Sequence, residues 1–200
     1  GLPPVSGIWS GWCCMSEFRW YALFTVLIFA ASVAAGVAVT AENPGVGDQM
    51  LEMFRDAILG EILDSTPAVL AVKLFLNNLQ ACVVMFLGGA SLGLLTAAII
   101  MANGVVIGSV VELVRQQQGL LYIAAALIPH GIFEISAFVI SGALGFLLAR
   151  NLWQEWKGAG DAAASALALG RIFLLVVLPL VAVAAFTEAF ITPEIIRLVA

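Results

Sequence analysis

Charged side chains are scarce in this chain of 200 residues. Lys, Arg, Asp and Glu make up 10% of it, whereas a soluble domain carries roughly 25% of such residues. This scarcity, together with an apolar content of 62%, excludes an ordinary soluble domain and indicates an integral membrane protein. The net charge is −5 and the basic residues form no cluster, so we expect no nucleic acid as a partner.

Histidine and cysteine are also scarce. The single histidine excludes the two-histidine helix motif of metalloproteases. The three cysteines, Cys13, Cys14 and Cys82, supply no disulfide framework. We therefore predict a non-enzymatic protein, with no catalytic residue, no metal and no cofactor.

Long uncharged runs predict an all-α, polytopic bundle of transmembrane helices with about five crossings, some of them broken or re-entrant. Residues 74–111 carry no formal charge and would form about 57 Å of helix, nearly twice a hydrocarbon core of roughly 30 Å. The run must therefore turn back. Asn103-Gly104 is the expected turn, after which residues 104–128 either span or re-enter the membrane. The predicted crossings are 20–41, 72–101, 104–116, 120–149 and 169–191.

A second over-long run, residues 120–149, carries Pro129 and Gly131 near its middle. Proline removes a backbone hydrogen bond from a helix, and both residues weaken it. We therefore predict that this helix is kinked or discontinuous at 128–131.

The remaining segments lie outside the crossings. Residues 1–19 form an N-terminal segment. Because Met15 looks more like a natural start of the protein than Gly1 does, we expect part of 1–14 to be a remnant of an expression tag or of a removed segment. Residues 20–200 form a single transmembrane domain. Within it, residues 48–64 place apolar side chains at helical spacing opposite an acidic face, which predicts a peripheral amphipathic helix.

The distribution of basic residues favours one orientation in the membrane. With five crossings, Arg19, Arg150 and Lys157 fall on the side of the N-terminus, and the acidic segment 48–64 falls on the other side. Arg115 also falls on that other side. Because basic residues are enriched in cytoplasmic loops, we expect a cytoplasmic N-terminus and an external C-terminus.

Polar side chains inside the apolar runs form the candidate site. His130 and Glu134 are four residues apart, so they share one face of a helix. Ionisable groups are costly in lipid and persist where they are paired, enclosed by protein or functional. The candidate residues are Lys73, Asn77, Asn78, Gln80, Asn103, His130 and Glu134.

Three interpretations of His130 and Glu134 stay open: a hydrogen-bonded network with Asn78 or Asn103, proton or substrate handling, and a metal site. We expect the network, because a metal needs further ligands. The conceivable ones, Cys82 and Glu112, have no support in the sequence pattern. We also expect the polar residues to converge in space, since burying a charged group without partners costs several kcal/mol.

Small residues recur at a spacing of four, which is typical of closely packed transmembrane helices within one subunit or between two. We expect a homodimer or another homo-oligomer. The pairs are Ser32 and Gly36, Gly89 and Gly93, Gly104 and Gly108, and Ser141 and Gly145. The predicted packing glycines are Gly89, Gly93, Gly104, Gly108, Gly131, Gly142 and Gly145.

Taken in order, these positions resemble the stage II sporulation protein M family. The set comprises Phe75-Leu76-Asn77-Asn78, Gly88-Gly89 with Gly93, Asn103-Gly104 with Gly108, Pro129-His130-Gly131 with Glu134, and Gly142 with Gly145. It covers about residues 74–150. The resemblance implies a multi-span protein of a prokaryotic plasma membrane without known catalytic activity. In endospore formers the family's namesake is a membrane scaffold for two peptidoglycan-degrading enzymes.

Two functions remain as expectations. The first is a scaffold that recruits envelope proteins or other membrane-complex subunits, with the 48–64 helix as a docking surface. The alternative is a small-solute or ion transporter or channel with a polar site at the membrane midplane. That site would be formed by Asn77, Asn78, Asn103, His130 and Glu134.

Overall fold

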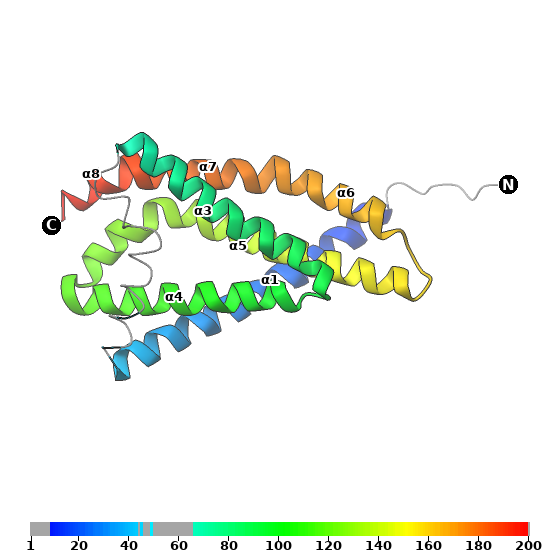
Figure 1. Cartoon of the computed structure of the whole chain (residues 1–200), viewed down its shortest axis with the longest axis horizontal. Coiled ribbons are helices and arrows are strands. Elements are labelled where there is room, and N and C mark those ends of the chain that lie inside the picture. Colours follow the sequence, from blue (N-terminus) through cyan, green and yellow to red (C-terminus); the bar gives the residue numbers. More distant parts are fainter. Residues whose placement is uncertain (1–8, 44, 46–48, 50–65, 200) are drawn as a thin grey trace.

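The computed structural model describes residues 9–43, 45, 49 and 66–199, and the side chains of this part from residue 17 onward. The regular elements in these ranges are all helical, which confirms the predicted all-α class. Five stretches are long and apolar enough to cross a membrane: Glu17–Glu42, Pro67–Ser91, Leu94–Gln118, Leu120–Trp156 and Ala162–Ile196 (Figure 1). The predicted number of crossings is therefore confirmed. The amphipathic helix predicted at 48–64 lies, residue 49 aside, outside the described residues.

The chain first reverses between α3 (Pro67–Leu87) and α4 (Leu94–Gln118). A 3₁₀ turn, η2 (Gly88–Ser91), follows α3, and Leu92 and Gly93 then adopt φ angles of 57° and 85°. The paired glycines of η2 are poor helix formers, so α3 ends there. Gly93 takes the left-handed conformation without the steric cost that a side chain would impose.

The turn predicted at Asn103-Gly104 is wrong, because α4 passes through both residues without interruption. The Asn103 side-chain amide donates a hydrogen bond of 2.9 Å to the Ile99 carbonyl, one turn earlier. The asparagine is therefore satisfied within the helix and does not end it. Residues 104–128 complete one crossing, turn at Gly119 and begin the next, so they do not re-enter.

The fourth crossing, α5 (Leu120–Trp156), is a single helix of 37 residues that contains Pro129. It bends in its first part (Figure 1). Proline has no N–H, so Pro129 cannot donate a hydrogen bond to the carbonyl of Ala125, four residues earlier. The backbone hydrogen bonding of the helix is therefore weaker here, although the helix continues. Of the two predicted alternatives, the helix is kinked and not discontinuous.

The last crossing is one long helix interrupted by two wider, π-helical turns. Each π turn shortly precedes a proline: η3 (Phe173–Val177) precedes Pro179, and η4 (Thr187–Ile191) precedes Pro193. Proline lacks an N–H and crowds the carbonyl four residues before it, which favours a wider turn at that point. The α-helical parts are α6 (Ala162–Ile172), α7 (Leu178–Phe186) and α8 (Thr192–Ile196).

The central helix of the bundle is α5, which contacts every other described element. Its residues Ser141–Ala149 are all buried. One apolar cluster around this stretch includes Phe86, Leu144 and Phe173, with the two phenyl rings stacked at 5.4 Å. A second cluster continues the core on the side of α1 (Trp9–Glu42) and α4. This half of the bundle is therefore filled by interlocking side chains.

Helices α1 and α4 cross with their backbones in contact, through two of the predicted small-residue pairs. A Cβ atom on Gly36 would meet the Val105 carbonyl, and one on Gly108 would meet the Val33 carbonyl. The Ser109 hydroxyl also donates a hydrogen bond of 3.3 Å to the Gly36 carbonyl. These small residues therefore serve packing within one subunit.

The other predicted packing glycines differ in their surroundings. Gly131 does not lie at a helix contact, because a Cβ atom there would meet only the Ile135 side chain, at 3.9 Å. The remaining glycines each face another element at close range: Gly89 faces Gly145, Gly93 faces Phe146, Gly104 faces Ser32, Gly142 faces Thr25, and Gly145 also faces Met85 and Thr96.

The contact between α1 and α4 predicts a large effect of one methyl group. Gly108→Ala should destabilise the purified protein by about 1–3 kcal/mol, because the new Cβ atom meets backbone that cannot rotate away. Gly170→Ala is the matched control, since this helical glycine has nothing within 4 Å of the added atom. Thermal unfolding followed by tryptophan fluorescence measures both. Equal unfolding temperatures for the two variants would contradict the close crossing.

Candidate functional site

A cavity of about 480 Å³ lies between α3, α4, α5 and the end of the last crossing. It is at the end of the bundle where α4 joins α5 and where the C-terminus lies (Figure 1). Most of its lining is aliphatic, and none of the described lining residues is Lys or Arg. The polar side chains that line it are Asn77, Asn78, Cys82, Asn103, Tyr122, His130, Glu134, Glu188 and Thr192.

Five of the seven candidate residues line this one cavity: Asn77, Asn78, Asn103, His130 and Glu134. They come from α3, α4 and α5. Lys73 and Gln80 do not line it: Lys73 is half-buried on α3, and Gln80 is exposed. The structure therefore brings together the residues of three crossings but not the whole predicted set.

Within the cavity, His130 and Glu134 face each other on consecutive turns of α5. Nε2 of His130 lies 3.8 Å from Oε2 of Glu134, which is longer than a hydrogen bond. The side chains are 14% and 31% exposed, so neither points fully into lipid. Their i,i+4 spacing places them side by side, as expected for one helix face.

The predicted hydrogen bonds between this pair and the asparagines are not formed among the described residues. The Asn77 amide lies 3.4 Å from the Asn78 carbonyl oxygen, and Asn103 donates to its own helix. The polar residues therefore share a cavity without forming one continuous network.

A third ionisable residue, Glu188, joins the pair and was not among the predicted site residues. Three possible metal-ligand atoms, one from each of His130, Glu134 and Glu188, lie within 4.8 Å of one another. Glu188 belongs to the π turn η4, and the Thr192 hydroxyl closes this turn with a 3.3 Å hydrogen bond to the Thr187 carbonyl. In the sequence, Glu188 looks like the polar end of a span, although apolar residues continue after it as far as Ile191.

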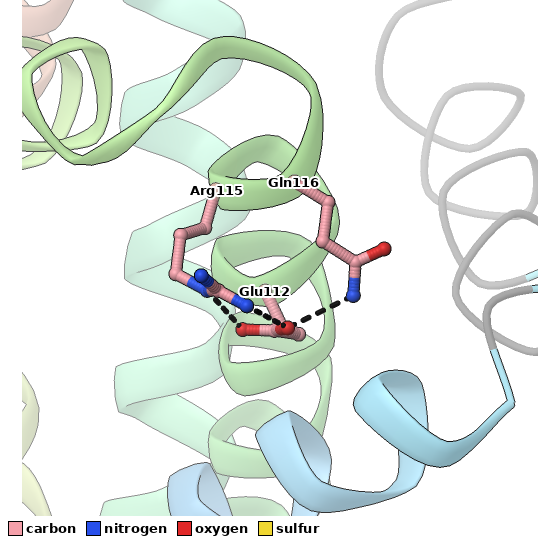
Figure 2. A network of polar contacts seen from close by, with 3 residues as sticks. All are labelled: Glu112, Arg115 and Gln116. Carbon is pink, nitrogen blue, oxygen red and sulfur yellow. Dashed lines mark hydrogen bonds and ion pairs between the residues drawn. The ribbon is translucent and has the colours of Figure 1, made fainter.

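Glu112, one of the two ligands considered for a metal, is used elsewhere. Figure 2 shows its carboxylate accepting two hydrogen bonds of 2.7 Å from Arg115 and one of 2.9 Å from Gln116. All three residues belong to the last turns of α4. The other candidate, Cys82, is a buried free thiol that lines the cavity but is not part of the cluster of three.

Residues Gly89–Gly93 match the Gly-x-Ser-x-Gly pattern of a hydrolase nucleophile. Ser91 lies in the turn between two helices, whereas the nucleophile elbow needs a strand before it. Its hydroxyl accepts a 2.9 Å hydrogen bond from the Leu95 N–H and donates one of 2.6 Å to the Gly88 carbonyl. The turn also lies at the opposite end of α4 from the cavity that holds His130 (Figure 1). Ser91 is therefore a helix-capping residue.

The fold defines a polytopic all-α integral membrane protein whose crossings surround a cavity lined by aliphatic and polar side chains. The chain belongs to the stage II sporulation protein M family, whose family model matches residues 25–193. This confirms the resemblance found over residues 74–150 and extends it to the flanking crossings. The chain is also 32% identical over 126 residues to an uncharacterized protein of Methanocaldococcus jannaschii, MJ0793, over 60% of this chain and 68% of that protein. No solved structure matches.

The geometry of the pair predicts different effects for two substitutions of Glu134. Glu134→Gln should be milder than Glu134→Leu, because the amide still offers His130 a hydrogen-bond partner while leucine leaves the imidazole alone beside Glu188. The unfolding temperatures of the two variants are compared with a chelator present, so that bound metal does not contribute to the stability of either. A leucine variant as stable as the glutamine variant would show that the polar contact contributes nothing.

Proposed function

We propose that this chain is a non-enzymatic scaffold that recruits partner proteins to a membrane or cell-envelope complex. Membership of a family of membrane proteins supports the membrane setting. The recruiting role is that of the family's namesake, and we extend it to this chain because of the resemblance. It rests above all on one structural observation, which is the rigid, closed half of the bundle.

In that half, the described helices form a closely packed frame. Lining residues of the cavity on α5 end at Phe138, and beyond them Ser141–Ala149 are buried throughout. Close contacts such as that of Gly89 with the Gly145 backbone hold the helices against one another. A frame of this kind suits a component that holds a fixed surface for other proteins.

A small-solute or ion transporter is the second candidate. The observation in its favour is that Asn77, Asn78, Asn103, His130 and Glu134 line one cavity. Transporters, however, alternate between states by moving one bundle of helices against another. Here the cavity ends at a packed core, and opening it would separate backbones in direct contact. We therefore favour the scaffold.

The test compares assembly with transport. Extracted from its native membrane with a co-polymer and without detergent, the chain should migrate in an assembly with other proteins. A photo-crosslinking residue in place of Leu175, which is 77% exposed, should give defined adducts. The same residue in place of Leu147, which is 4% exposed, is the control and should give none to partners. Saturable solute uptake by proteoliposomes of the pure chain, without any adduct, would overturn the proposal.

Self-association is also part of this proposal. The small-residue pairs that suggested it are occupied within the subunit, where Ser32 packs on Gly104 and Gly89 on Gly145. A homodimer would therefore use other lipid-facing side chains, such as those on η3. Crosslinks from Leu175 to a second copy would locate that surface.

We further propose a cytoplasmic N-terminus and an external C-terminus. Arg150 at the end of α5 is paired with Glu17 of α1 through contacts of 2.6 and 2.5 Å, so the ends that carry Arg19, Arg150 and Lys157 lie together. At the opposite end of the bundle, Arg115 is paired with Glu112 and Arg197 with Glu194. A basic end on the cytoplasmic side follows the positive-inside rule.

Cysteine labelling tests this orientation. In a Cys13→Ser, Cys14→Ser background, a cysteine replacing Gln117 at the α4–α5 turn should react with an impermeant maleimide in intact cells. A cysteine replacing Ala159 in the loop after α5 should react only after lysis. Both positions are exposed, so access to the reagent depends on the side of the membrane. The reverse pattern would invert the topology.

A further inference from the structure

Three metal-ligating side chains meet in the cavity, and the scaffold proposal gives them no role. His130 and Glu134 come from α5 and Glu188 from η4, and one ligand atom of each lies within 4.8 Å of the other two. The i,i+4 spacing aligns the first two. The π turn before Pro193 presents the third from the last crossing.

None of these three side chains makes a hydrogen bond to another described residue. Nδ1 of His130 is buried without a partner, and Nε2 is 3.8 Å from Glu134. Buried polar groups in proteins are nearly always hydrogen-bonded or bound to an ion. A buried imidazole nitrogen without a partner, beside two carboxylates that accept no hydrogen bond from a described residue, therefore indicates that something else completes the site.

The missing partner must be positive. Glu134 and Glu188 bring two carboxylates into a mostly aliphatic cavity in which no described lining residue is Lys or Arg. Two carboxylates side by side repel each other, and a single dication would neutralise both. An imidazole nitrogen in the same cluster selects against hard cations such as Mg²⁺ and Ca²⁺, which prefer oxygen ligands only.

We propose that His130, Glu134 and Glu188 bind one divalent transition-metal ion, of the Zn²⁺ type, within the membrane-embedded cavity. Zinc sites with histidine and carboxylate ligands have bonds of about 2.0–2.2 Å, which place tetrahedral ligand atoms about 3.4 Å apart. The separations of 3.8 Å and up to 4.8 Å reach this value by small side-chain rotations. Three protein ligands leave a fourth position for water. The proposal departs from the expectation that no metal binds, because Glu188 supplies a ligand that the sequence pattern lacked.

Metal titration of the full chain in lipid nanodiscs tests the site. The tag-free protein, first stripped with a chelator, should bind about one Zn²⁺ per chain by equilibrium dialysis and elemental analysis. Bound Co²⁺ should show the visible absorption bands of a four-coordinate site. Glu188→Gln should weaken Zn²⁺ binding by more than the roughly 10- to 100-fold that loss of an outer-shell partner costs.

The matched control is Glu194→Gln. Glu194 is a nearby carboxylate on α8, but it is exposed and paired with Arg197. This variant should bind Zn²⁺ like the wild type. Zn²⁺ should raise the unfolding temperature of the wild type and of Glu194→Gln, but not that of Glu188→Gln. Unfolding without metal shows that each variant is folded. Absence of saturable Zn²⁺ and Co²⁺ binding by the wild type, or wild-type affinity in folded Glu188→Gln, would overturn the proposal.

Discussion

The whole bundle depends on the close approach of four crossings at the middle of α5. Gly142 faces Thr25 of α1, and Gly145 faces both the Met85 carbonyl at the end of α3 and Thr96 of α4. The Thr96 hydroxyl donates a buried hydrogen bond of 2.8 Å to that same carbonyl. In lipid there is no hydrophobic force between helices, so such van der Waals contacts and short polar links are what hold them.

This junction divides the molecule into two unlike halves. On one side, phenyl rings and leucines fill the space around Ser141–Ala149. On the other side, the bend after the start of α5 and the π turn η4 leave a cavity with three ionisable groups. The packed half supplies the rigidity that keeps these costly groups in one place.

Composition and hydropathy were sufficient to predict the class of fold and the number of crossings, and the ordered polar and glycine motifs indicated the family. Charge-free runs report where a chain can cross, but they do not report where it turns, because asparagine can be satisfied inside a helix. The sequence therefore predicts a turn at Asn103-Gly104, whereas Gly88, Gly89 and Gly93 form it. Most of the candidate site followed from the cost of placing His130 and Glu134 in lipid. Glu188 did not, because its place depends on a π turn, and helical periodicity assumes that no such turn exists.

The π turns have an evolutionary consequence. Each contains one residue more than the α-helical path needs, and every residue after it is rotated by about 100° around the axis. A related chain that lacked one residue in η4 would keep the same length of span and nearly the same hydropathy, yet it would present the following helix surface in another direction. Insertions and deletions of single residues in this crossing are therefore rotations of a functional face, and alignments of the family that place gaps only in loops would hide them.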